Sequence, residues 1–176
     1  MAGQCIILMG VAGTGKSCVG QALAKRFNAK FIDGDDLHPR ANIQKMASGQ
    51  ALDDSDRGPW LERLNDVAFS LRQKNETGFV VCSALKKRYR DCLRAGNAGI
   101  TFLWLTGEFP LVLDRMQRRS GHFMPESLLQ SQFTALEAPG AQEPDVIAVN
   151  IDASLPVVVD RCTDALARVP AFSRCA

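Results

Sequence analysis

Several features that would mark a specialised class of protein are missing from this sequence. No apolar run approaches the roughly 20 residues that a helix needs to cross a bilayer, so we expect no membrane partner. His38 and His122 are the only histidines, and they provide no recognisable set of zinc ligands. The formal net charge of +2 is too small to indicate a nucleic-acid partner by itself.

The six cysteines do not form a recognisable disulfide framework. They lie far apart, no two of them make a C-x-x-C pair, and the N-terminus lacks the pattern of a signal peptide. Cys5 and Cys82 lie inside apolar runs, which is typical of small buried hydrophobic residues. We therefore expect reduced thiols and a cytoplasmic protein.

The chain shows neither an internal repeat nor a low-complexity linker. Its 176 residues are 46% hydrophobic and 23% charged, which is typical of a globular protein with one core. We therefore predict a single domain over residues 1–176.

A glycine-rich segment near the N-terminus carries the most specific motif. Gly10, four further residues and then Gly15-Lys16-Ser17 match the P-loop, whose backbone N–H groups surround nucleotide phosphates. In such a loop Lys16 reaches the β and γ phosphates and Ser17 ligates magnesium. An ordinary βα turn is the alternative, but an apolar run before the loop and a helical pattern after it support the motif. The expected ATP-binding residues are Gly10, Val11, Ala12, Gly13, Thr14, Gly15, Lys16 and Ser17.

Apolar runs of strand length alternate with helical patterns along the whole chain. This alternation predicts an α/β fold with a five-stranded parallel sheet and helices on both faces. Between the second strand and the next helix, residues 42–58 predict a short helix followed by a flap-like loop. Pro59 would then open a helix, with Arg57 just before it. The expected strands are 5–9, 29–32, 78–82, 100–105 and 145–151, and the later helices include 59–74, 126–136 and 157–169.

An acidic cluster, Asp33-Gly34-Asp35-Asp36, follows the second strand. Ligands of parallel α/β sheets bind at the carboxyl ends of the strands, so these side chains should face the γ phosphate and its acceptor. One carboxylate could hold magnesium through water, and another could orient and deprotonate a hydroxyl. A solvated turn with a helix cap is the alternative for this segment.

Two basic segments also stand at the ends of expected elements. Residues 86–94 carry five cations around Tyr89, and this pattern fits either an anionic small molecule or, less well, RNA. Arg115, Arg118 and Arg119 precede a glycine-containing loop, which predicts a lid over residues 115–130 that brings positive charge to the phosphates. Cations that only favour a helix C-terminus, or that are solvated, are the alternatives.

These segments together resemble a known family. The motifs are G-V-A-G-T-G-K-S at 10–17, F-I-D-G-D-D-L-H-P-R at 31–40, D-D-S-D-R-G-P-W-L at 53–61, C-S-A-L-K-K-R-Y-R-D at 82–91 and G-H-F at 121–123. They are similar to the thermoresistant-type gluconokinases over nearly the whole chain. The resemblance implies a three-layer fold of the nucleoside-monophosphate-kinase type with a lid.

The resemblance also implies an activity. Such an enzyme transfers the γ-phosphoryl group of ATP, with Mg²⁺, to the 6-hydroxyl of D-gluconate. The 6-phosphogluconate formed would enter the pentose phosphate pathway. These enzymes are typically cytosolic and often dimeric, so a homodimer is the implied assembly.

Site residues can be carried over from the matching motifs. By similarity to the related shikimate kinases, Asp35 is expected to be the base that faces the acceptor and Asp33 the outer partner of magnesium. Asp36 departs from the family pattern, which often has a bulkier apolar residue there. Arg119 is the expected catalytic arginine of the lid. Arg115 is expected to contact ATP as well, while Arg118 is the variable member of the three.

The acceptor itself is an acid with a polyol chain, so cations and hydrogen-bonding groups should surround it. We expect His38 to contact a hydroxyl, and the matched G-H-F motif adds His122. A shikimate- or nucleoside-type kinase and a nucleotide-binding regulatory protein are the rival interpretations. The cations expected to bind the carboxylate are Arg57, Lys86 and Arg90.

Overall fold

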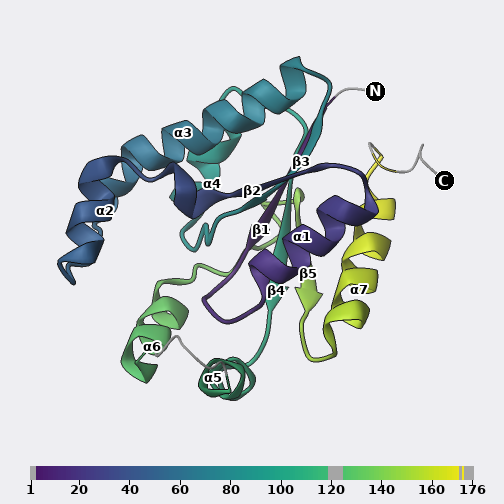
Figure 1. The fold of residues 1–176 in the computed structure, drawn as a ribbon. Helices are drawn as coiled ribbons and strands as arrows, with labels where there is room; N and C mark the ends of the chain where they lie inside the picture. Colours follow the sequence, from purple (N-terminus) through teal and green to yellow (C-terminus); the bar gives the residue numbers. More distant parts are fainter. Residues whose placement is uncertain (1–2, 119–124, 171, 173–176) are drawn as a thin grey trace.

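The structure is a computed structural model, and it describes residues 3–118, 125–170 and 172. Its centre is a five-stranded sheet in the order β2-β3-β1-β4-β5, in which all neighbouring strands are parallel (Figure 1). The predicted parallel α/β sheet is therefore confirmed. The strands are β1 (Gln4–Met9), β2 (Lys30–Asp33), β3 (Thr77–Val81), β4 (Ile100–Thr106) and β5 (Val146–Asn150).

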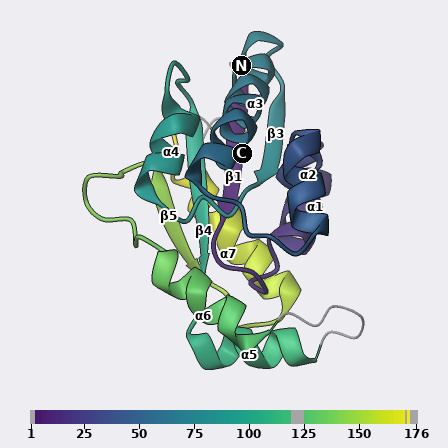
Figure 2. The same ribbon diagram turned by 90° about the vertical axis from the view of Figure 1, so that its left-hand side faces the viewer.

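Both faces of the central strand β1 are buried, which explains its continuous apolar sequence. Ile6 and Leu8 point into a core shared with α1 (Lys16–Arg26) and α7 (Leu155–Ala167). Ile7 and Met9 point into a second core, formed with α3 (Asp54–Gln73) and α4 (Lys87–Arg94). The two helical layers on opposite sides of the sheet are seen in Figures 1 and 2, and they confirm the three-layer arrangement.

Two further helices lie beside each other beyond the ends of β1 and β4 (Figure 1). They are α5 (Phe109–Gln117) and α6 (Glu126–Ala135), and they pack edge to face through Phe109 and Phe133, whose ring centroids are 5.3 Å apart. At the carboxyl end of β2, the 3-10 helix η1 (Gly34–Leu37) leads into α2 (Arg40–Ala47). Within the described residues, none of the helices is both long and apolar enough to span a membrane.

The start of α3 differs from the prediction. The helix begins at Asp54 rather than Pro59, because Asp53 and Asp56 form a capping box in which each carboxylate accepts the other residue's backbone N–H. Pro59 is thus the sixth residue of the helix, and Arg57 lies inside the helix instead of before it. Asp54 and Arg57 are therefore helical residues in the first turns of α3.

Candidate active site

The P-loop connects β1 to α1 at the carboxyl end of the sheet. Gly10, Gly13 and Gly15 all have positive φ angles, of 136°, 79° and 87°, a region that only glycine enters without strain. A Cβ atom at Gly10 would also stand 2.6 Å from the carbonyl oxygen of Leu105. The Nζ of Lys16 donates to the carbonyl oxygens of Gly10 and Val11 at 3.0 and 2.8 Å, so the ammonium group lies over the loop.

A cavity of about 280 Å³ opens next to this loop. The Arg115 guanidinium lies in its wall and donates through Nη2 to the carbonyl oxygens of Ile151 and Ala153, at 2.6 and 2.9 Å. The cavity therefore lies between the P-loop and the turn after β5, with the guanidinium fixed in its wall. Its other lining residues are Gly13, Thr14, Gly15, Cys18, Val19, Ala153, Leu155 and Val158.

The acidic cluster lies at the end of β2. The Asp33 carboxylate accepts the backbone N–H of Asp35 at 3.1 Å and so caps η1. The pKa of the Asp35 carboxyl is raised by partial burial in the site and by the negative charge of Asp33, while His38 and Lys16 act in the opposite direction. Because the Asp35 side chain is 84% exposed, repulsion from Asp33 is the better supported cause of the raised pKa. Asp33 is in register with Val81 of β3, and Val81 with Leu8 of β1, so the acidic cluster and the P-loop lie at the same edge of the sheet, two strands apart.

His38 is buried beside this cluster. Its ring stacks on Trp60 with the centroids 4.3 Å apart, and its Nε2 lies 3.8 Å from Oδ1 of Asp35. The Asn42 amide donates both to the backbone oxygen of Asp56 and, at 3.2 Å, toward Nδ1 of His38. Nδ1 is thus the acceptor, and this contact assigns the proton to Nε2 on the Asp35 side. Burial lowers the pKa of His38, the charge of Asp35 opposes that shift, and the charge of Arg57 adds to it, so we assign the neutral ring.

A group of cations surrounds Tyr89 at the start of α4. Arg57 from α3 lies 5.7 Å from the centre of the tyrosine ring, and Lys86 and Arg88 lie 5.6 and 5.5 Å from it. We call these four residues the Tyr89 cluster. Arg57 lies three residues before Trp60 on α3, and Trp60 stacks on His38, so the cluster adjoins the Asp35 and His38 end of the site. The acidic cluster follows β2 and Lys86 follows the neighbouring strand β3, so carboxylates and cations lie near each other at the carboxyl edge of the sheet.

Comparison with known proteins shows which family this chain is similar to. The family model for shikimate kinase matches residues 12–167. The thermosensitive gluconokinase of Escherichia coli K12 is 54% identical over 176 residues, which cover 100% of this chain and 94% of that protein. The thermoresistant gluconokinase of the same organism is 51% identical over 153 residues, which cover 87% of each protein.

A solved structure gives the same result. The crystal structure of a gluconokinase from Sinorhizobium meliloti 1021 matches with a TM-score of 0.86 and 41% identity, over 97% of this chain and 95% of that one. The chain belongs to the gluconokinase family. The resemblance inferred from the motifs is therefore confirmed, and so is the fold that it implied.

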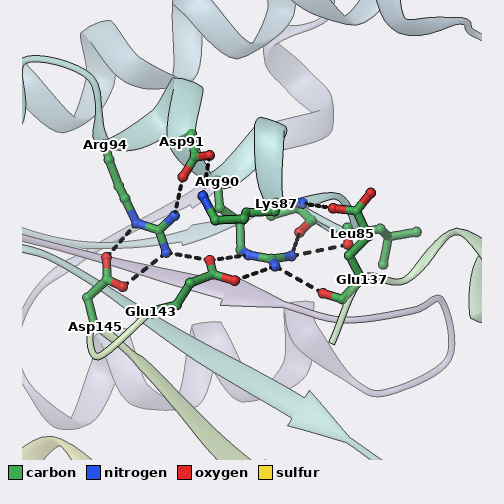
Figure 3. A network of polar contacts seen from close by, with 9 residues as sticks. Leu85, Lys87, Arg90, Asp91, Arg94, Glu137, Glu143 and Asp145 are labelled. Carbon is green, nitrogen blue, oxygen red and sulfur yellow. Dashed lines mark hydrogen bonds and ion pairs between the residues drawn. The ribbon is translucent and has the colours of Figure 1, made fainter. Parts of the chain in front are cut away.

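One predicted acceptor contact in this gluconokinase-family chain is wrong. Arg90 is fully buried, and its N–H groups are bonded within the protein (Figure 3). Nε and Nη2 donate to the two carboxylate oxygens of Glu143 at 2.7 Å each. Nη1 donates to the carbonyls of Ala84 and Leu85, and Nη2 also donates to that of Glu137. Because these contacts occupy its donors, Arg90 has no group left to bind a substrate carboxylate.

The buried guanidinium of Arg90 instead stabilises the backbone next to the site. Two of the three carbonyls that it binds, those of Ala84 and Leu85, belong to the turn between β3 and α4, where Ala84 has a φ of +44°. Glu137 adds to the same support, because its carboxylate accepts the backbone N–H of Lys87 at 2.6 Å and its own N–H donates to Leu85. The network therefore fixes the turn that carries Lys86. Arg94 continues it through ion pairs with Glu143, Asp145 and Asp91 (Figure 3).

Sequence reasoning missed a second contact, between α6 and the P-loop. The side-chain oxygen of Gln132 accepts the backbone N–H of Ala12 at 2.7 Å. These residues are 120 positions apart, and a glutamine on a helix carries no signal of such a contact. An N–H of the phosphate-binding loop thus contacts a side chain of α6, the helix that begins within the predicted lid.

The remaining predictions concern the lid. Arg119 and His122 lie outside the described residues, so their roles stay predictions. Arg118 is exposed and pairs with Asp114 at 3.0 Å, and its assignment as the variable arginine stays a prediction. Ser17, the expected ligand of magnesium, is exposed in the first turn of α1.

Proposed function

We propose that this protein transfers the γ-phosphoryl group of ATP to the 6-hydroxyl of D-gluconate and so forms 6-phosphogluconate. One observation carries the proposal. The acidic cluster with Asp35 lies at the same edge of the sheet as the P-loop, two strands away. The Tyr89 cluster adjoins it through α3, where Arg57 lies over Tyr89 and Trp60 stacks on His38. A base beside the phosphates and a cationic region further away suit an acceptor that has a hydroxyl at one end and a carboxylate at the other.

For the donor, the backbone of residues 10–17 provides N–H groups for the phosphates, and the 280 Å³ cavity beside Arg115 suits the nucleoside. Lys16 would exchange its two carbonyl partners for phosphate oxygens, which are better acceptors for an ammonium group. Arg119 is proposed to add its charge from the lid. Phosphoryl transfer depends mainly on such placement and charge neutralisation.

The residues present fit a magnesium ion. Mg²⁺ is usually held by one or two protein oxygen ligands together with phosphates and water. Ser17 supplies a hydroxyl in the first turn of α1, and Asp33 supplies a carboxylate at the end of β2, at the same edge of the sheet. Within the described ranges no group of three or more metal-binding side chains is present, so the proposed binding involves the nucleotide. When bound, the ion supplies positive charge that offsets the charge of the phosphates.

For the acceptor, Asp35 is the proposed general base for the 6-hydroxyl. The neutral His38 is proposed to donate from Nε2 to a hydroxyl, since Asn42 holds the ring in that tautomer. Arg57 and Lys86 are the proposed partners of the carboxylate. A cytoplasmic homodimer that has no nucleic-acid partner also remains a prediction.

A coupled assay of ATP consumption tests the assignment. The panel contains D-gluconate, other sugar acids, shikimate and nucleosides at equal concentrations. We expect D-gluconate to give the highest kcat/KM. If ATP is consumed no faster with D-gluconate than without it, or faster with shikimate or a nucleoside, the proposal is wrong.

A further inference from the structure

Asp54 is an acidic residue in contact with the Tyr89 cluster. It is the first residue of α3, and its Oδ1 accepts the Tyr89 hydroxyl and lies 3.3 Å from Nζ of Lys86. Its Oδ2 pairs with the guanidinium of Arg88. One carboxylate therefore contacts three members of the cluster, all from the start of α4.

Helix capping does not account for this position of Asp54. The N-terminus of α3 is already capped by Asp53 and Asp56, whose carboxylates accept the N–H groups that the helix leaves free. Asp54 directs its carboxylate to α4 instead. Three cations and one carboxylate leave the group with an excess of positive charge, so it remains attractive to a second anion.

The position of Asp54 along α3 relates it to the acceptor site. Asp54, Arg57 and Trp60 follow one another at intervals of three residues, so they lie toward one side of the helix. Trp60 stacks on His38, and Arg57 lies over Tyr89. This side of α3 thus runs from the hydroxyl-binding end of the site, at His38, to the cationic end, where Asp54 is found.

We propose that Asp54 is an internal substitute for the carboxylate of the acceptor. It holds Lys86, Arg88 and Tyr89 in place while the site is empty, and a sugar-acid carboxylate displaces it on binding. This inference rests on the proposed function, since only an acidic acceptor would make the exchange. Asp54 then limits the affinity for acidic acceptors: an acceptor with a carboxylate must compete with it, whereas one without a carboxylate leaves it in place.

The test is Asp54→Asn, which keeps the size of the side chain and removes its charge. We expect the Kd for D-gluconate, measured by calorimetry with the full-length protein, to fall by about three- to fivefold, the factor of one partly exposed ion pair. The KM for ATP should be unchanged. The gain should shrink as salt is raised, because both pairings are partly exposed to solvent.

The matched control is Asp91→Asn on α4. It removes the same charge from the same region, but Asp91 pairs with Lys87 and Arg94 and not with the Tyr89 cluster. It should leave the Kd for D-gluconate within about twofold of the wild-type value, a change smaller than that of one ion pair. Asp54→Glu, which keeps the charge, should bind D-gluconate no more tightly than the wild type does.

Three results would overturn the inference. They are an unchanged or higher Kd for D-gluconate in Asp54→Asn, an equal gain in Asp91→Asn, and a gain in Asp54→Glu. A thermal melt of each variant shows whether it is folded, and a purely structural tie would lower the melting temperature without tightening binding. If the wild type neither binds D-gluconate nor consumes ATP with it, the proposed function itself fails, so the two failures are distinguishable.

Discussion

The side chain of Gln132 holds the backbone N–H of Ala12 at 2.7 Å and thereby ties α6 to the P-loop. The connection matters because α6 begins within the predicted lid, residues 115–130, and ends two residues before Glu137, whose carboxylate accepts the backbone N–H of Lys87 in α4. The segment made of α6 and Glu137 therefore contacts both the donor loop and the start of α4.

This contact predicts the effect of Gln132→Ala. Losing the acceptor frees the Ala12 N–H and loosens α6, so we expect kcat/KM for ATP to fall by about three- to tenfold, the range of one hydrogen bond. Steady-state kinetics with ATP varied at saturating D-gluconate measures the change. Gln130→Ala is the control, since Gln130 is exposed on the same helix. Equal losses in both variants would contradict a specific role for Gln132.

Asp35→Asn tests the general base. We expect ATP affinity to stay near normal and kcat to fall by roughly 10² or more, the scale of a lost general base. In the wild type, kcat should decline as the pH falls through the raised pKa of Asp35, which lies above the 3.8 that is ordinary for an aspartate. Near-normal turnover in the variant would exclude this role.

The same substitution should stabilise the fold. A carboxyl whose pKa is higher in the folded state binds its proton more readily there, so its ionisation opposes folding once the pH exceeds the ordinary pKa of the unfolded chain. Asp35→Asn should therefore melt at a higher temperature than the wild type at neutral pH. The difference should vanish below pH 3.8, where the carboxyl is protonated in both states, and an opposite sign at neutral pH would contradict the raised pKa.

Lys16→Ala tests the use of the P-loop. The ammonium group is the only side-chain cation that the motif itself supplies to the phosphates, so we expect weaker ATP binding and a fall in turnover of about 10²–10³. Fluorescence titration with a labelled nucleotide and the coupled assay measure the two effects. Unaltered ATP affinity would show that the loop is not used as argued.

Arg90→Met tests the buried network. Removing one partner of a buried ion pair typically costs about 3–5 kcal/mol of unfolding free energy. Here Glu143 would lose its buried partner and keep only the ion pair with Arg94, so we expect a loss toward the lower end of that range. Denaturant unfolding measures it. Arg26→Met is the control, because Arg26 pairs with Asp160 at the same 2.7 Å but at the exposed surface, where a loss below about 1 kcal/mol is expected. A similar loss in both variants would refute the buried role.

Low pH should weaken the stability that the Arg90–Glu143 network provides. Hydrogen bonds from Arg90, with help from Arg94, lower the pKa of Glu143 from 4.5 to about 2. The stability that this carboxylate provides is present above pH 4.5 and is lost as the pH falls toward 2. Glu143→Gln should therefore flatten the loss of stability over that window, as measured by denaturant unfolding at several pH values.

The sheet and the P-loop could be predicted because their signals are local. Gly10, Gly15, Lys16 and Ser17 lie within one turn of chain, and the buried strands are continuous apolar runs. The start of α3 also has a local signal, because Asp53 and Asp56 have capping-box spacing. The prediction placed the start at Pro59 instead, because proline is common in the first turn of a helix.

The role of Arg90 could not be read from its neighbours in the chain. A run of cations on a short helix does not show which face is buried, and the partner that decides it, Glu143, is 53 residues away. Gln132 and Ala12 are further apart still, at 120 residues. Such contacts depend on how α4 and α6 pack, and packing is not encoded in the spacing of one segment.

The hydrogen-bond network around Arg90 has a practical consequence for engineering. The guanidinium holds Glu137 and Glu143 at once, so both ends of the connection from α6 to β5 are fixed. Residues 138–142 lie between these anchors and are mostly exposed. A peptide tag or reporter inserted after Gly140 would lengthen a loop whose closure has little dependence on length. It would leave the donor loop and the Tyr89 cluster where they are.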